Sequence, residues 1–195
     1  MSRQTRQRIT HEAARIMMDD GVTNIAVAKK KAMQRLGVQD KHQMPDNIEV
    51  ESALCDYQQL FQPDQHISLL NKYRKTALNA MTMLKPFSPR LAGPVLRGTA
   101  TKYNTVSIHV FTDTPEEIHF HLMDRRIPFE IDESQYQLSK KQIVVCPVCR
   151  FFAGEVEITL SIFPNNGLHQ PPLSSIDEKP MKRVDIESVK TLISG

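Results

Sequence analysis

The first half of the chain shows the spacing of apolar residues that amphipathic helices require. Apolar side chains recur at intervals of three and four residues over 5–19, 24–36 and 64–85, and in a segment that starts at Asp46. Gly21 and Gly37 follow the first two segments, where a glycine commonly ends a helix, and Pro86 ends the last. Asp46 and Glu49 have the spacing of a capping box. The pattern therefore predicts four helices before residue 86.

The second half changes to the alternating pattern of strands. Residues 105–111 (TVSIHVF) alternate and are rich in β-branched side chains, which predicts a strand. Further strands are predicted at 127–131, 142–152 and 155–163, and further helices at 115–126 and 185–193. Thr114 is the expected N-cap of the first of these helices, and Ala153-Gly154 suits a hairpin. The Pro-, Asn-, Gly- and Ser-rich segment 164–180 is predicted to be a loop.

This change of pattern predicts an α+β or α/β fold. We expect a helical region over residues 1–88, followed at 89–195 by a small mixed β-sheet flanked by helices. The long helix over 64–85 can pack on the sheet and so belong to both halves.

Composition narrows the class of protein and its expected location. The chain has 195 residues, of which 40% are hydrophobic, and that is enough for a real core. No apolar run approaches the ~20 residues of a membrane-spanning helix, and no apolar stretch follows the basic residues 1–8 to make a signal peptide. Three cysteines do not form a disulfide framework. We therefore expect a cytoplasmic protein with no membrane partner, and we leave its oligomeric state open.

Basic residues gather in the first two predicted helices. The net charge is only +3, but three arginines lie within residues 1–8 and a second cluster follows at Lys29, Lys30, Lys31 and Arg35. Such a cluster has two interpretations. It is a binding surface for nucleic acid or another polyanion, or it is the solvated face of a helix.

One segment resembles a known superfamily. Residues 93–100 (GPVLRGTA), followed by the strand at 105–111, resemble the nucleotidyltransferase superfamily, whose members carry a strand, a Gly-Ser pair and a short helical turn. In that family the next strand carries an Asp-x-Asp pair, and a later strand carries a third acid. The chain also resembles a small bacterial group labelled nucleotidyltransferase-like. The resemblance covers residues 90–165 and implies a nucleotidyltransferase-like fold for the second half.

The resemblance implies a phosphate-binding turn. Gly98-Thr99 keeps a glycine and a hydroxyl, and in the family such a turn lets backbone amides and the hydroxyl approach the phosphates of a nucleotide. Arg97 and Lys102 flank the turn and are expected to meet phosphates. A tight turn after a strand is the competing interpretation.

The acids of the family motif are largely missing. Thr105 and Ser107 stand where the resemblance places the two carboxylates, with His109 on the same face of the strand. Glu157 is the remaining candidate for the third, catalytic acid, although it also suits the solvent-facing side of a strand. The family uses Mg²⁺, which prefers oxygen ligands, so an active enzyme would need Mg²⁺ but no protein metal site is predicted.

Two classes of function follow. The first is an enzyme that transfers a nucleoside monophosphate from an NTP, with weakened or lost catalysis. The second is a non-catalytic protein that binds a nucleotide or nucleic acid. Cys146 and Cys149 are expected to be buried and inert, and His109, His119 and His121 are not expected to bind zinc. No P-loop and no Gly-x-Ser-x-Gly nucleophile turn is present in the sequence.

Overall fold

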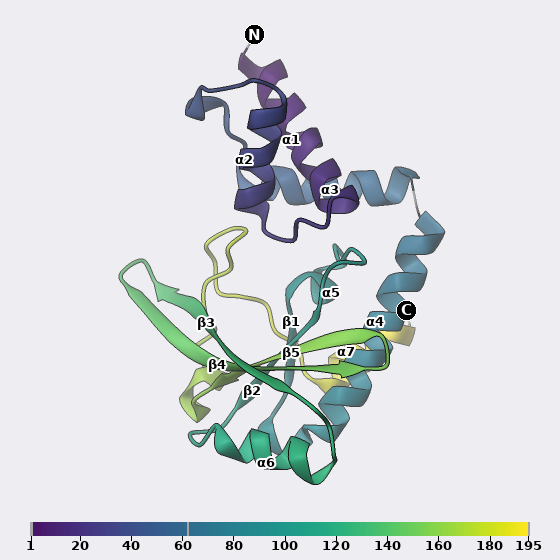
Figure 1. Ribbon diagram of the computed structural model, residues 1–195, viewed down its shortest axis with the longest axis vertical. Helices are drawn as coiled ribbons and strands as arrows, with labels where there is room; N and C mark the ends of the chain where they lie inside the picture. Colours follow the sequence, from purple (N-terminus) through teal and green to yellow (C-terminus); the bar gives the residue numbers. More distant parts are fainter. Residues whose placement is uncertain (1, 62, 195) are drawn as a thin grey trace. The chain divides into compact units, whose positions relative to one another are not determined.

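The protein is a mixed α/β structure. A computed structural model describes residues 2–61 and 63–194, and within them it contains seven α-helices and one five-stranded sheet (Figure 1). The helices are α1 (Ser2–Asp19), α2 (Ile25–Arg35), α3 (Asn47–Phe61), α4 (Pro63–Met83), α5 (Gly93–Arg97), α6 (Glu116–Asp124) and α7 (Ile186–Ser194). The strands are β1 (Arg90–Ala92), β2 (Val106–Phe111), β3 (Glu130–Ser139), β4 (Gln142–Ala153) and β5 (Val156–Phe163). Helices followed by a mixed sheet confirm the coarse fold class predicted from the sequence.

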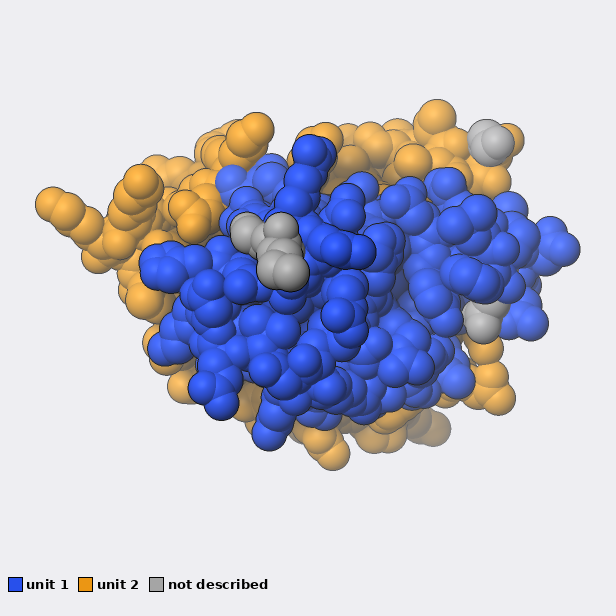
Figure 2. Space-filling view, turned by 90° about the horizontal axis from the view of Figure 1, so that it is seen from above, with its two compact units in different colours: residues 1–69, 98–104, 175–177 blue, residues 70–97, 105–174, 178–195 orange. Residues whose placement is uncertain are grey.

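Contacts divide the chain into two compact units (Figure 2). Unit 1 contains residues 1–69, 98–104 and 175–177, and unit 2 contains residues 70–97, 105–174 and 178–195. The division falls inside α4, between Leu69 and Leu70, so this helix contributes to both units. The domain boundary predicted at residues 88–89 stays a prediction, because compact units need not coincide with domains.

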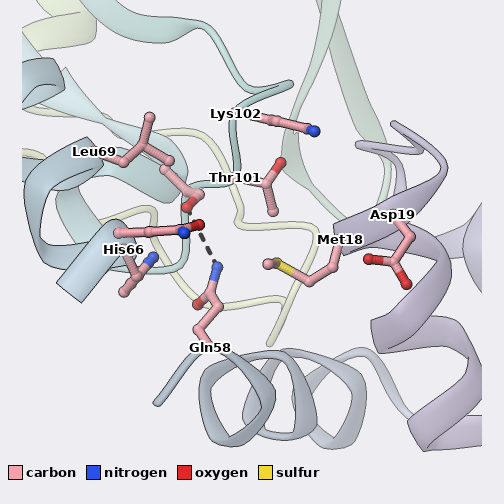
Figure 3. Close-up of a pocket in the computed structure, with 9 residues that line it drawn as sticks. Met18, Asp19, Gln58, His66, Leu69, Thr101 and Lys102 are labelled. Atoms are coloured by element: carbon pink, nitrogen blue, oxygen red, sulfur yellow. Dashed lines mark hydrogen bonds between the residues drawn. The ribbon is translucent and has the colours of Figure 1, made fainter. Parts of the chain in front are cut away.

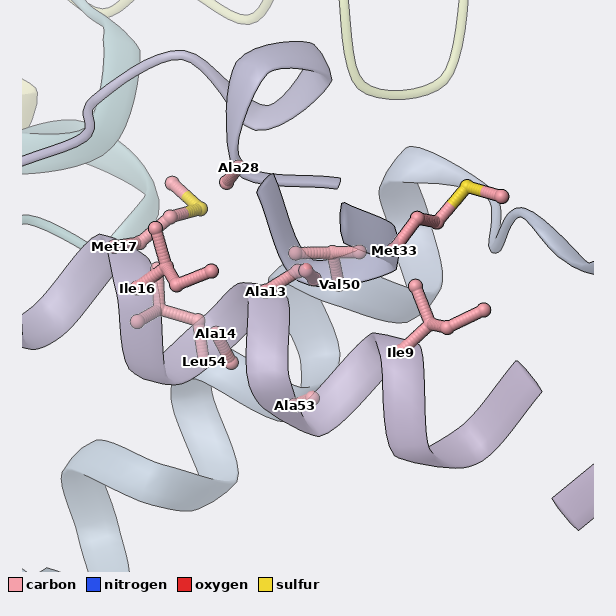
Figure 4. Packing of buried hydrophobic residues seen from close by; sticks show 11 residues of the cluster. Ile9, Ala13, Ala14, Ile16, Met17, Ala28, Met33, Val50, Ala53 and Leu54 are labelled. Carbon is pink, nitrogen blue, oxygen red and sulfur yellow. The ribbon is translucent and has the colours of Figure 1, made fainter. Parts of the chain in front are cut away.

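Unit 1 has its own hydrophobic core, which α1, α2 and α3 form together (Figure 4). The fully buried side chains Ile9, Ile16 and Val50 lie at its centre, and several alanines let the helices approach closely. The predicted signals at the helix ends are present. Gly21 and Gly37 adopt φ values of 74° and 66°, in the left-handed region that glycine tolerates.

The start of α3 is held from two directions. Glu49 Oε2 accepts the backbone N–H of Asp46 at 2.6 Å, which confirms the predicted capping-box contact. The guanidinium of Arg6 in α1 donates to the same carboxylate through Nε at 3.0 Å and through Nη2 at 2.6 Å. One carboxylate therefore caps α3 and joins it to α1.

Unit 2 is built on the sheet, whose strand order is β1-β2-β5-β4-β3. Only β2 and β5 run parallel, and the other neighbouring pairs are antiparallel. One face of the central strands carries fully buried aliphatic side chains, as do the inward stripes of α4 and α6. These are Ile108 and Leu160 on the strands, Ala77 and Met81 on α4, and Ile118 and Leu122 on α6.

The opposite face of the sheet has a second, smaller core. Phe111, Cys146 and Phe163 are buried there, with Tyr136, Val144 and Leu168 packed against them. Cys146 and Cys149 are free and buried, and burial raises the pKa of each thiol to about 11. A thiol with such a pKa stays protonated at neutral pH, which confirms the expectation that the two cysteines are buried and agrees with their being inert.

Three local predictions were wrong. The strand expected at 127–131 is β3, which begins and ends later, and most of its side chains are exposed, so it lacks the apolar pattern of a strand. The turn at Gly98-Thr99 was expected to follow a strand, but it follows α5, and the strand before α5 is β1. Thr114 does not cap α6, because Pro115 holds the N-cap position without a side-chain hydrogen bond. Within the described ranges, no helix combines the length and hydrophobicity needed to cross a bilayer.

Candidate functional site

A pocket of about 350 Å³ lies within unit 1 (Figure 3). Its lining comes from α1, α3, α4 and the segment 98–104, which includes Lys102 from the predicted phosphate-binding region. Met18 and Leu69 supply apolar surface, and Gln58 and His66 supply polar atoms. The volume is in the range of small-molecule pockets.

Gln58 and His66 fix the segment 98–104. Gln58 is only 1% exposed, and its Nε2 donates to the carbonyls of Thr99 at 3.2 Å and Ala100 at 3.3 Å. His66 Nε2 lies 2.9 Å from the carbonyl oxygen of Gly98. A carbonyl only accepts, so Nε2 carries a proton and donates it. Gln58 Oε1 is buried and accepts no hydrogen bond from the residues that the structure describes.

The predicted phosphate turn has a left-handed glycine, but its hydroxyl is engaged. Gly98 has a φ of 81°. Thr99 is 5% exposed, and its Oγ1 donates to Glu51 Oε1 at 3.3 Å, so it would have to leave this carboxylate to meet a phosphate. Arg97 ends α5 in unit 2, while Lys102 is exposed, with its Nζ 5.0 Å from the ring centre of Tyr103. Their nucleotide-binding roles stay predictions.

Strand β2 places the other predicted site residues in unit 2. Ser107 and His109 pair in register with Thr159 and Ser161 of β5, and they share a face because they are two residues apart. Just before β2, Thr105 Oγ1 lies 2.9 Å from Thr159 Oγ1.

Glu157 lies near the start of β5. It directly precedes Ile158, the register partner of Val106, so it lies beside Thr105 and not beside His109. Its side chain is neither fully buried nor fully exposed. A catalytic role for Glu157 stays a prediction, since the contacts of β5 do not test it.

A glycine that the sequence reasoning passed over approaches Ser107. Gly93 directly follows β1 and begins α5, with a φ of 73°, and a Cβ added to it would lie 3.4 Å from Ser107 Cβ. The order of strand, glycine, helical turn and strand therefore occurs at Gly93-Pro94. A proline in the first turn of a helix was the available sequence signal.

His109 is a buried base in an apolar and positively charged environment. It is 1% exposed, and its ring lies 4.7 Å from that of Phe163 and 5.6 Å from that of Tyr136, measured between centroids. Burial, together with the charge of Arg183, lowers the pKa of His109 to about 3, so it is neutral at physiological pH.

Arg183 brings a guanidinium to the same face of the sheet. Its Cζ lies 5.2 Å from the ring centre of Phe111, and its Nη2 donates to the carbonyls of Gly167 and Leu168. Its Nη1 and His109 Nδ1 are both buried and have no hydrogen-bond partner within the described chain. Two buried nitrogens without partners are unusual. Arg183 Nη1 carries N–H groups and suits a bound acceptor, whereas His109 Nδ1 donates or accepts according to its tautomer.

The predicted nucleic-acid surface is only partly exposed. Lys29 Nζ donates to the carbonyl of Pro45 at 2.9 Å, and burial lowers the pKa of this lysine. Arg35 forms ion pairs with Glu12 at 3.2 Å and with Asp20 at 2.5 Å. Lys30 and Lys31 are exposed. A nucleic-acid partner stays a prediction, with these two lysines as its most accessible contacts.

Residues 2–61 and 63–194 contain no group of three or more His, Cys, Asp or Glu side chains placed to hold a metal ion. This absence concerns metal sites whose ligands are all protein side chains. It does not test the binding of Mg²⁺ that arrives together with a nucleotide. His119 stacks on Phe129, and His121 Nε2 lies 2.9 Å from the carbonyl oxygen of Met83.

Comparison with known proteins gives no match for this chain, either to a family model or to a curated protein. The function is therefore argued from the geometry of the two units.

Proposed function

We propose that the protein is a nucleotidyltransferase-like protein of the cytoplasm that binds the phosphates of a nucleotide without transferring them. The observation that carries the proposal is on β2. Ser107 and His109 occupy positions two residues apart on one face, and Ser107 lies beside the glycine that follows β1. The resemblance places two carboxylates on this strand.

The order and direction of the elements support the fold assignment. A long helix precedes β1, the glycine and short helix follow it, and β2 runs antiparallel to β1. Helix α6 comes next, and β5 then lies parallel to β2. This is the sequence of elements that the resemblance implies, with Gly93 in place of Gly98 as the glycine of the turn.

The chemistry of this face favours an anion over a metal ion. Burial and then the charge of Arg183 lower the pKa of His109, and burial and then the charge of Arg90, which pairs in register with His109, lower the pKa of Arg183. Positive and neutral nitrogen donors bind phosphate oxygens directly, whereas Mg²⁺ requires oxygen ligands. Ser107 adds a hydroxyl. This face of the sheet therefore offers groups that bind phosphate. It lacks the carboxylates that would position two metal ions for transfer of a nucleoside monophosphate.

Thermal shift measurements test the binding. ATP and GTP should raise the melting temperature both with Mg²⁺ and with EDTA, because ligand binding to the native state stabilises it. Gly93→Ala should weaken this shift by crowding the turn. Gly37→Ala is the matched control, since Gly37 has a similar φ of 66° but open space around it. The proposal fails if no NTP raises the melting temperature.

Incubation with radiolabelled NTPs tests the catalytic alternative. With Mg²⁺ or Mn²⁺ present, we expect no transfer of label to protein, nucleic acid or small acceptors. Label transfer that Glu157→Gln abolishes would show an active enzyme and would overturn the non-catalytic assignment. Glu155→Gln is the control, since Glu155 is exposed two residues away and pairs with Lys72.

A further inference from the structure

The pocket of unit 1 has a buried polar atom that accepts hydrogen bonds but cannot donate them, Gln58 Oε1. Gln58 Nε2 donates to the backbone carbonyls of Thr99 and Ala100. Its Oε1 is therefore a buried acceptor without a partner in the described chain. Thr101 Oγ1 donates to Asn104 Oδ1 at 3.1 Å and accepts from the backbone of Tyr103 at 3.3 Å, so it is already engaged. A ligand that satisfies Gln58 Oε1 must present a hydrogen-bond donor, such as an N–H group.

Two large apolar side chains, Met18 and Leu69, contribute to the walls of the pocket, beside polar side chains such as Gln65. Figure 3 shows Leu69 and Met18 on opposite sides of the space above Gln58. Leucine and methionine side chains pack well on both faces of a flat ring, and a thioether contacts aromatic rings favourably. The surfaces of Met18 and Leu69 therefore suit the faces of a planar ring.

The rim carries one charge of each sign. Asp19 and Lys102 are both exposed and both line the pocket. Their charges oppose each other, so the rim selects neither an anion nor a cation. An uncharged ligand enters without leaving either charge desolvated and uncompensated.

From these three features we infer that the pocket of unit 1 binds an uncharged heteroaromatic ring that carries an exocyclic amine, of the size of a nucleoside. The amine donates to Gln58 Oε1, and the ring lies between Met18 and Leu69. All lining residues belong to unit 1, whereas the phosphate-binding face belongs to unit 2. The inference is therefore independent of the proposed function.

Nuclear magnetic resonance of the full chain with ¹³C-labelled methionine methyl groups tests the site. Met18 is identified by the signal lost in Met18→Leu. Adenosine should shift the Met18 methyl signal in a saturable way. Purine riboside, which has the same ring without the amine, should bind about tenfold more weakly, because Gln58 Oε1 then stays unpaired. Equal affinity for the two nucleosides would overturn the inference.

Filling the pocket provides the second test. Leu69→Trp and Met18→Trp should each abolish adenosine binding measured by calorimetry. Met123→Trp is the control, because Met123 is 59% exposed on α6 in unit 2. Circular dichroism and the melting temperature without ligand report whether each variant folds. The adenosine and purine riboside comparison uses the wild-type chain, so a variant that does not fold leaves the test intact.

The result expected is adenosine binding that either tryptophan removes and that Met123→Trp leaves unchanged. Binding that survives in a folded Leu69→Trp variant, or no binding of adenosine to the wild-type chain, would overturn the inference. Loss of NTP-induced stabilisation in Gly93→Ala, with adenosine binding unchanged in the same variant, reports separately on the face of unit 2.

Discussion

At the scale of single residues, His109 makes the stability of the protein depend on pH. Its pKa falls from 6.5 to about 3 because the ring is buried and lies near Arg183. Below pH ~6.5 the unfolded chain binds a proton at this residue and the folded chain does not. The stabilisation is therefore complete above pH 6.5 and is lost as the pH falls toward 3.

This gives a measurable prediction for acid conditions. Between pH 7 and pH 5 the wild-type protein should lose about 2 kcal/mol of unfolding free energy through His109, at ~1.4 kcal/mol per pKa unit. His109→Leu should lack this loss. The matched control is His11→Leu, because His11 is exposed on α1. Urea unfolding at the two pH values provides the measurement, and an equal loss in His109→Leu and wild type would contradict the assignment.

At the scale of elements, the start of α3 should depend strongly on one carboxylate. Glu49 accepts from Arg6 of α1 and from the backbone N–H of Asp46. Glu49→Ala removes both contacts, so we expect a loss of about 1–2 kcal/mol of unfolding free energy.

An isolated surface pair gives the control for Glu49. Glu187 pairs with Lys190 at 2.8 Å, and its side chain is 78% exposed. Glu187→Ala should therefore cost no more than ~0.5 kcal/mol. If thermal or urea unfolding shows equal losses for the two variants, then Glu49 is an ordinary surface residue and the capping contact contributes little.

The elements also show what the sequence could predict. Helices α1 to α4 were predictable because their signal is local, in the spacing of apolar residues and in glycines at two helix ends. Strand β3 was not, because its burial pattern is mostly exposed and its backbone is held by pairing with β4. Strand β1 has three residues, too few to show any alternation, and pairing with β2 defines it.

The candidate site followed the same rule. The sequence indicated the face of β2 through the period of two, and it named Ser107 and His109. It could not reveal that Gly93 approaches Ser107, because that contact depends on the pairing of β1 with β2. Nor could it link His109 with Arg183, since only the folded chain brings residues so far apart in sequence together.

At the scale of the whole molecule, each unit is assembled from separate stretches of chain. The segment 98–104 belongs to unit 1, although the residues on either side of it belong to unit 2. Three side chains of the helices hold it by hydrogen bonds with its residues, namely Gln58, Glu51 and His66. Unit 1 therefore depends on a segment that local sequence alone would have assigned to the sheet region.

This organisation predicts that the two units lose protection separately. Gln58→Leu leaves the carbonyls of Thr99 and Ala100 without their donor, at a cost of about 1–3 kcal/mol. Hydrogen exchange with mass spectrometry should then show faster exchange in α1 to α3 and little change in β5. Each unit has its own core, so opening of one need not expose the other.

The reciprocal variant completes this prediction. Ile158 is fully buried in β5, and Ile158→Val removes one methyl group at a cost of about 0.5–1.5 kcal/mol. Exchange should then rise in β5 and its neighbouring strands while α1 to α3 stay protected. Equal increases in both units for both variants would show that the chain unfolds as one cooperative body, because a local loss in either unit would then lower the stability of every amide by the same amount.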